Sequence, residues 1–209
     1  MRLTPFVLQA AAPDPDPAEL ALSLAAELHQ LDLAPVEQAL DALAAGLTQD
    51  TRPAPERLRA LGEVMAEFAS VAPPASIDGL LLDRVLECRA GDPLLLAVVA
   101  AEVGRRAGLE LTLLSCHGRP LVAYVEDGHA VALDVIGDCP RLREDEQPHC
   151  HCAHQVAFAI LGAVIERATR AGDLVTAIKA AELRLALPLE RSALAALGSE
   201  LLALRVRLN

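Results

Sequence analysis

The sequence predicts an α+β fold that is mostly helical, with a central helix packed on a small antiparallel sheet. Three observations support this prediction. Gly91-Asp92-Pro93 opens an uninterrupted apolar helix pattern that continues to residue 107. Strand-like runs follow at residues 109–116, 121–125 and 130–135, with turn residues at Gly118 and at Asp127-Gly128. Amphipathic helix patterns flank this stretch on both sides, so we expect an N-terminal helical support and a C-terminal helical array.

Composition limits the class of protein. The chain has 209 residues, 53% of them hydrophobic, which is enough for a sizeable core. No apolar run approaches the roughly 18 uncharged residues that a membrane span needs, so we expect a soluble protein. The first residues lack the apolar stretch of a signal peptide, and the five cysteines are an odd number. These two features favour a cytoplasmic protein without a disulfide framework.

Charge and aromatic content argue against nucleic acid as a partner. The net charge is -11, and no basic stripe runs along the chain. The sequence has no Trp, one Tyr and three Phe, so it has few side chains on which bases or sugars could stack. We therefore expect a partner that is a protein rather than a nucleic acid or a membrane.

Residues 1–75 are predicted to form the helical support. Asp16 followed by Pro17 is typical of a helix start, and two further proline-led segments begin near Pro35 and Pro53. Each segment carries apolar residues at helical spacing. The stripes are Leu20, Leu24, Leu28 and Leu31, then Val36, Leu40, Leu43 and Leu47, then Leu58, Leu61, Met65 and Phe68.

Residues 76–140 are predicted to form the core, and residues 149–209 the helical array. A short helix at 77–89 leads into the core, and a polar, irregular stretch at 137–148 follows it. Helices are then expected from near His149 to about Arg170, at 174–187 and at 189–208. Gly172-Asp173 pairs a helix stop with a helix start. Each of these helices needs a neighbour to bury its leucine face.

Several motifs of this chain resemble the SirB-type bacterial branch of the transglutaminase-like superfamily. They are Leu82-x-x-Val85-Leu86-x-x-Arg89-x-Gly91-x-Pro93, then Arg105-Arg106-x-Gly108-Leu109, and the strand segments 118–124 and 133–136. Members of that branch commonly end in tetratricopeptide-like helices, and Arg170-x-Gly172-Asp173-x-x-x-Ala177 resembles their inter-helix turn. The resemblance implies a transglutaminase-like, papain-like core followed by such helices.

The resemblance also implies a Cys-His-Asp triad, which this sequence does not keep. The position of the nucleophile falls on Pro93, that of the base on Arg119, and that of the orienting acid on Asp134. Proline has no nucleophilic group, and an arginine cannot act as a base near neutral pH. Arg119 and Asp134 could instead form a salt bridge. We therefore expect a degenerate site without catalytic residues or cofactor, in a protein that acts through protein–protein contacts.

Two alternatives remain open from the sequence. A relocated set of Cys116, His129 and Asp134 could serve a cysteine hydrolase or acyltransferase. Tetrahedral zinc sites use Cys and His, so a dense cluster of these residues could bind zinc or hold redox-active thiols. That cluster is His149, Cys150, His151, Cys152 and His154. Cys116, His117 or Cys139 would have to complete a zinc site through the fold, or a second subunit would.

Overall fold

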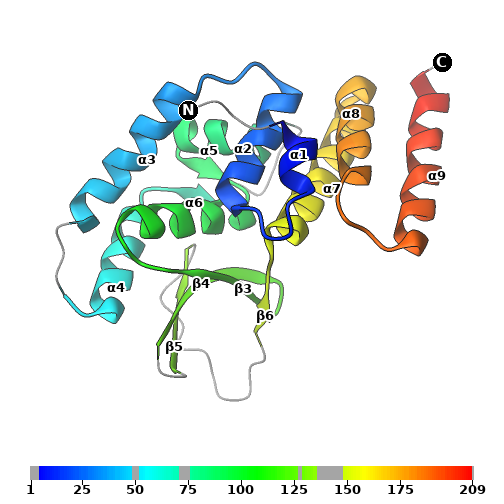
Figure 1. Ribbon diagram of the computed structural model, residues 1–209. Coiled ribbons are helices and arrows are strands. Elements are labelled where there is room, and N and C mark those ends of the chain that lie inside the picture. Colours follow the sequence, from blue (N-terminus) through cyan, green and yellow to red (C-terminus); the bar gives the residue numbers. More distant parts are fainter. Residues whose placement is uncertain (1–4, 49–51, 71–75, 127–128, 136–147, 209) are drawn as a thin grey trace. The chain divides into compact units, whose positions relative to one another are not determined.

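The computed structural model describes residues 5–48, 52–70, 76–126, 129–135 and 148–208. It is mostly helical with two small sheets, which confirms the predicted α+β class (Figure 1). Contacts between Cα atoms divide the chain into two compact units. The helical unit comprises Met1–Leu31, Pro73–Asp83 and Cys152–Asn209, and the core unit comprises Asp32–Ala72 and Arg84–His151. The division into residues 1–75, 76–140 and 149–209 stays a prediction.

The core unit is built on a four-stranded antiparallel sheet with the order β5-β4-β3-β6. β3 (Thr112–Cys116) and β4 (Arg119–Glu126) form a hairpin, and β5 (His129–Asp134) pairs with the other side of β4. His117 and Gly118 connect β3 to β4, with φ angles of 50° and 77°. Such a left-handed two-residue loop matches the twist of the strands it joins. The three predicted strands are confirmed.

The predicted central helix is α6 (Pro93–Arg106), which packs on β3 and β4. Its first turn is capped by Asp92, whose Oδ1 accepts a hydrogen bond from the Leu94 amide at 3.1 Å. α3 (Leu33–Thr48) and α4 (Ala54–Met65) pack on α6, and α4 also contacts β5. Nine residues of α6 are buried, so this helix is the centre of the unit. The predicted arrangement of a helix on a small sheet is therefore confirmed.

A short parallel ladder precedes α6. β1 (Ala69–Ser70) pairs with β2 (Ala90–Gly91), which follows α5 (Leu82–Cys88). A Cβ atom at Gly91 would lie 2.5 Å from a methyl carbon of Val85, closer than any side chain allows. The close approach of α5 to β2 therefore requires glycine at this position.

The start of the next helix is a correction to the sequence analysis. A helix was expected from near His149, but His149–Cys150 forms the edge strand β6, and α7 (Ala153–Ala171) begins after Cys152. β6 pairs with Leu114 and Ser115 of β3, and the His151 amide donates to the Leu113 carbonyl at 2.9 Å. The backbone groups of these residues satisfy the free edge of β3 instead of forming a first helical turn.

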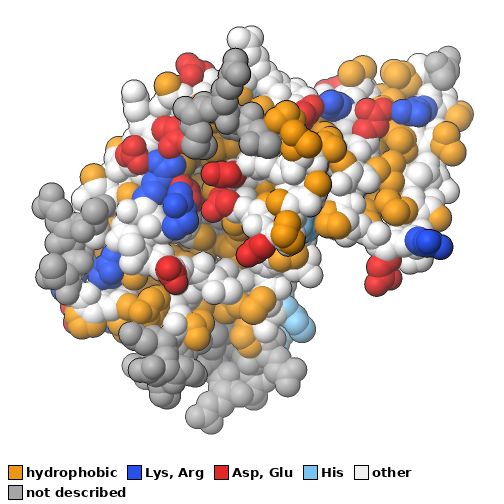
Figure 2. Space-filling view, viewed as in Figure 1, with side chains coloured by type: hydrophobic (Ala, Val, Ile, Leu, Met, Phe, Trp, Pro, Cys, Tyr) orange, Lys and Arg blue, Asp and Glu red, His pale blue; other side chains and the backbone are white. Residues whose placement is uncertain are grey.

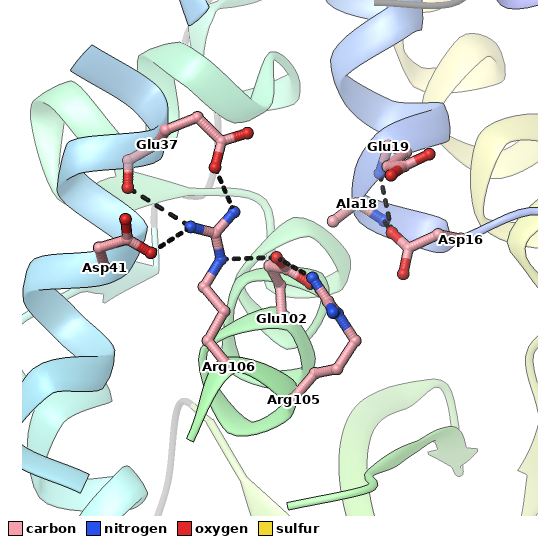
Figure 3. Close-up of polar contacts among 8 residues, drawn as sticks. All are labelled: Asp16, Ala18, Glu19, Glu37, Asp41, Glu102, Arg105 and Arg106. Atoms are coloured by element: carbon pink, nitrogen blue, oxygen red, sulfur yellow. Dashed lines mark hydrogen bonds and ion pairs between the residues drawn. The ribbon is translucent and has the colours of Figure 1, made fainter. Parts of the chain in front are cut away.

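The helical unit contains α1 (Phe6–Ala10), α2 (Pro17–Leu28), the short 3-10 helix η1 (Asp78–Leu80), and α7 to α9. α2 starts as predicted, with Asp16 accepting hydrogen bonds from the amides of Ala18 and Glu19, both at 2.9 Å (Figure 3). α2 packs on α7 and α8, and α8 (Leu174–Leu185) packs between α7 and α9 (Arg191–Leu208).

The α7–α8 corner confirms the predicted stop and start. Gly172 ends α7 with a φ of 79°, and the carboxylate of Asp173 accepts from the Thr176 amide at 3.0 Å to begin α8. Within the described ranges, no helix is both long and apolar enough to cross a membrane. The turn predicted at Asp127-Gly128 and the irregular stretch at 137–147 with Cys139 lie outside those ranges.

Candidate functional site

The three positions that the resemblance assigned to a triad all lie in the core unit. Pro93 is the first residue of α6, directly after the capping Asp92. Proline fits this place because the first helical amide needs no partner within the helix. The start of α6 therefore carries no thiol or hydroxyl that the helix dipole could activate.

Arg119 and Asp134 form an ion pair on neighbouring strands. Leu121 lies opposite Asp134 in the ladder, so Arg119, two residues before Leu121, is the diagonal neighbour of Asp134 on the same face. Nη2 of Arg119 donates to Oδ2 of Asp134. The Asp134 side chain is 6% exposed and that of Arg119 is 60% exposed. The predicted salt bridge is confirmed: a buried carboxylate is neutralised by a guanidinium that reaches it from the surface.

An apolar cluster adjoins this pair. Strand register places Cys116 opposite Arg119, and residues at every second position of β3, β4 and β5 share this face. The buried members of the cluster are Leu114, Cys116, Leu121, Ala123 and Ala132. Asp134 is therefore held in a charge pair with arginine, and a guanidinium, unlike an imidazole, does not accept a proton near neutral pH.

The residues of the alternative cysteine site are not gathered at one point. Cys116 is buried, and its Sγ lies 3.4 Å from Nδ1 of the neighbouring His117. His129 pairs with Glu126 at the start of β5, whereas Asp134 ends the same strand. Their Cα atoms are therefore about 17 Å apart at the usual rise of an antiparallel strand. The structure brings Cys116 close to His117 and Arg119, and it leaves His129 at the opposite end of β5 from Asp134.

The residues of the His/Cys cluster have different local roles. His149 and Cys150 form β6, Cys152 directly precedes α7, and both thiols are exposed. Nε2 of His154 donates to the Ala10 carbonyl at 3.0 Å. Nδ1 of His151 is buried and has no hydrogen-bond partner within the described ranges. Burial, reinforced by the nearby His149, lowers the pKa of His151 below its usual value of 6.5.

The described part of the chain contains no group of three or more His, Cys, Asp or Glu side chains placed to hold a metal ion. One of the five residues, His154, is already engaged by a backbone carbonyl. The zinc site stays a prediction.

Comparison with known proteins identifies the family. The sequence model of the transglutaminase-like superfamily matches residues 34–157. The chain belongs to this superfamily. The matched region contains α6 and all four strands of the sheet that carries Arg119 and Asp134. No curated protein sequence matches the chain significantly.

A solved structure shares the fold of this transglutaminase-like chain. It is described as "Crystal structure of menin reveals the binding site for Mixed Lineage Leukemia (MLL) protein". The superposition has a TM-score of 0.52 and a sequence identity of 14%, and it covers 97% of this chain and 60% of the menin chain. At this identity the match shows similarity of fold, and the chain spans less than two thirds of the menin structure.

A second charged cluster of the transglutaminase-like domain was missed by the sequence analysis. It lies near the C-terminal end of α6, where Glu102 is 5% exposed and accepts hydrogen bonds of 2.7 Å from Arg105 and Arg106 (Figure 3). Arg106 also donates to the Glu37 carboxylate at 2.7 Å and to Asp41 at 2.5 Å, both on α3.

This cluster keeps Arg106 charged. Burial alone would lower the pKa of Arg106, but its hydrogen bonds to Glu102, Glu37 and Asp41 outweigh burial and raise the pKa above the ordinary value. The sequence signal was an acid three and four residues before two arginines, the spacing of neighbours on one helix face. The partners on α3 are 65 and 69 residues away and have no local signal.

Proposed function

We propose that this chain is a non-catalytic transglutaminase-like protein that acts through protein–protein contacts. The observation that carries the proposal is the ion pair between Arg119 and Asp134. Triad chemistry needs a thiolate, an imidazole base and an acid that orients the imidazole. At the corresponding positions this chain has a proline, an arginine and an aspartate. The arginine donates a hydrogen bond to the carboxylate of the aspartate.

We further propose that the chain is of the SirB type and that α7, α8 and α9 form a tetratricopeptide-like array. The support is the packing of each helix on the next, together with the corner at Gly172 and Asp173. Arrays of this kind present extended surfaces to other proteins. The menin structure is described as revealing a binding site for another protein, which fits an interaction role for this fold.

Thiol reactivity tests the loss of catalysis. Cys88, Cys150 and Cys152 are exposed, whereas Cys116 is buried. We expect iodoacetamide at neutral pH to modify Cys150 and Cys152 faster than Cys116, as followed by mass spectrometry of the full chain. An Asp134→Asn variant should leave this order unchanged. Labelling of Cys116 ahead of the exposed thiols would contradict the proposal.

A cysteine hydrolase is the second candidate, and one contact favours it. The 3.4 Å separation of Cys116 Sγ from His117 Nδ1 places a thiol beside an imidazole that could take its proton. If the chain is a cysteine hydrolase, iodoacetamide should label Cys116 fast, and a His117→Ala variant should be labelled more slowly. The non-catalytic proposal expects slow labelling in both proteins, so the same experiment separates the two.

A further inference from the structure

The helical unit has an open groove between α7 and α9. Its volume is about 480 Å³, within the range of ligand-binding clefts. Its apolar lining comes from Gly162 and Ile165 of α7 and from Leu204 of α9. Figure 1 shows the three helices in sequence, with α8 joining the two that border the groove.

The polar lining of this groove offers hydrogen-bond donors that are not used. Arg207 lines the groove and makes no ion pair or hydrogen bond with any described residue. The hydroxyl of Thr169 is buried there and also has no hydrogen-bond partner among the described residues. A ligand that brings acceptor oxygens would satisfy donors that are otherwise unpaired.

The acids that line the groove are already engaged. Glu166 accepts from Arg170 on the same helix, and Glu200 lies 3.5 Å from Arg184. On the neighbouring surface Arg205 is likewise held by Glu182 at 2.7 Å. Arg207 is thus the cation of this groove that has no described counter-charge, and the charge complementarity favours an anionic ligand over a cationic one.

We propose that the groove between α7 and α9 binds a segment of a partner protein that carries an Asp or Glu side chain beside small apolar residues. The carboxylate pairs with Arg207, and the apolar neighbours lie on Ile165 and Leu204. This inference rests on the proposed interaction role and assigns it a surface. Because Arg207 is solvent-exposed, binding should weaken as salt is added.

Selection of random peptides on the immobilised full chain tests this assignment. We expect enrichment of peptides containing Asp or Glu, and binding of the synthesised peptides is then measured by fluorescence anisotropy. Arg207→Glu should weaken binding at least about tenfold, as expected for loss of a charge-assisted hydrogen bond. Ala203→Trp places a large side chain in the groove from an exposed position and should weaken binding similarly. Arg191→Glu makes the same charge change at the other end of α9 and should have little effect.

Each other outcome overturns the inference. Enrichment of neutral or basic peptides, or of none, would exclude an acidic partner segment in this groove. Acidic peptides that bind equally to the wild type, Arg207→Glu and Ala203→Trp would place the binding surface elsewhere and leave the proposed interaction role standing. The proposed loss of catalysis is measured separately by thiol labelling, so the two failures are distinguishable. Circular dichroism of each variant checks that α7 to α9 remain folded.

Discussion

Two arginines of the core unit bind buried acids, and they do so in different ways. Arg106 is 17% exposed and binds Glu102, Glu37 and Asp41, which come from two helices. Arg119 is 60% exposed and binds one described carboxylate, that of Asp134. The first guanidinium donates to acceptors on both α3 and α6 and connects these helices, whereas most of the second faces solvent.

The difference separates a charge cluster that joins two helices from a single ion pair at the surface of the sheet. A guanidinium with several carboxylates in fixed geometry holds two elements together. A guanidinium that covers one carboxylate from the surface neutralises a buried charge and does little else. The Arg119–Asp134 pair joins a carboxylate that is buried in the sheet to a guanidinium at the surface, and the following changes test this comparison.

Removal of Glu102 should have the largest effect. Glu102→Ala deletes the buried carboxylate that Arg105 and Arg106 share, and it leaves Arg106 partly buried with fewer acceptors. We expect a loss of roughly 3–5 kcal/mol in the free energy of unfolding, measured by urea denaturation. Glu166→Ala, which breaks an exposed helical pair, should cost less than about 1 kcal/mol. Equal costs for the two variants would mean that the cluster at the end of α6 is not structural.

Removal of Arg119 should lower the free energy of unfolding by less than removal of Glu102. Arg119→Ala leaves the Asp134 carboxylate buried without its guanidinium, and we expect a loss of about 1–3 kcal/mol by the same measurement. Asp134→Asn in the Arg119→Ala background should recover part of this loss, because the buried group is then neutral. If the double variant is less stable than the single one, the pair is not a simple neutralisation of a buried charge.

Asp173 is a carboxylate that accepts a hydrogen bond from a backbone amide instead of from an arginine. An Asp173→Ala variant should lose about 1 kcal/mol in the free energy of unfolding. Hydrogen bonds from Thr176 outweigh burial and lower the pKa of Asp173 below 3.8. Its contribution is therefore complete above pH 3.8 and is lost as the pH falls through the folded-state pKa. Thermal melts of both proteins between pH 7 and acidic pH should converge. A constant difference would show that the charge of Asp173 is not involved.

Replacement of His151 should have the smallest effect on stability. This effect should appear near neutral pH, where Arg106 and Arg119 do not titrate. Its pKa is lowered in the folded chain, so below pH 6.5 the unfolded chain binds a proton that the folded chain resists. Stability should therefore decline as the pH falls from 7 towards 5. A His151→Gln variant should show a shallower decline in its melting temperature. An unchanged slope would assign the decline to other groups.

Local sequence signals predicted much of the core unit. The start of α6 followed from Asp92-Pro93, and the β3–β4 hairpin from the turn at Gly118, because capping and turn conformation depend on a few adjacent residues. The Arg119–Asp134 pair was expected from the resemblance, which placed the two residues at positions that meet in the fold.

Features that depend on distant residues were not predicted. The helical spacing of Val156, Ile160 and Val164 did not show that the helix begins only after Cys152. The competing partner of His149 and Cys150 is the edge of β3, which lies far away in the sequence. The bonds of Arg106 to α3 and the groove between α7 and α9 likewise depend on residues that only the fold brings together. Spacing along one helix predicts which residues share a face, but it does not predict which distant element packs against that face.

The two-residue strand β6 has a consequence for aggregation. It occupies β3 at Leu114 and Ser115, the side opposite to β4, where unpaired backbone amides and carbonyls would otherwise face solvent. Exposed strand edges recruit strands from other molecules, and a short, polar edge strand is one of the ways in which proteins prevent this. His149 and Cys150 therefore cover this edge of β3. A chain in which they could not pair with β3 would be prone to form oligomers through this strand.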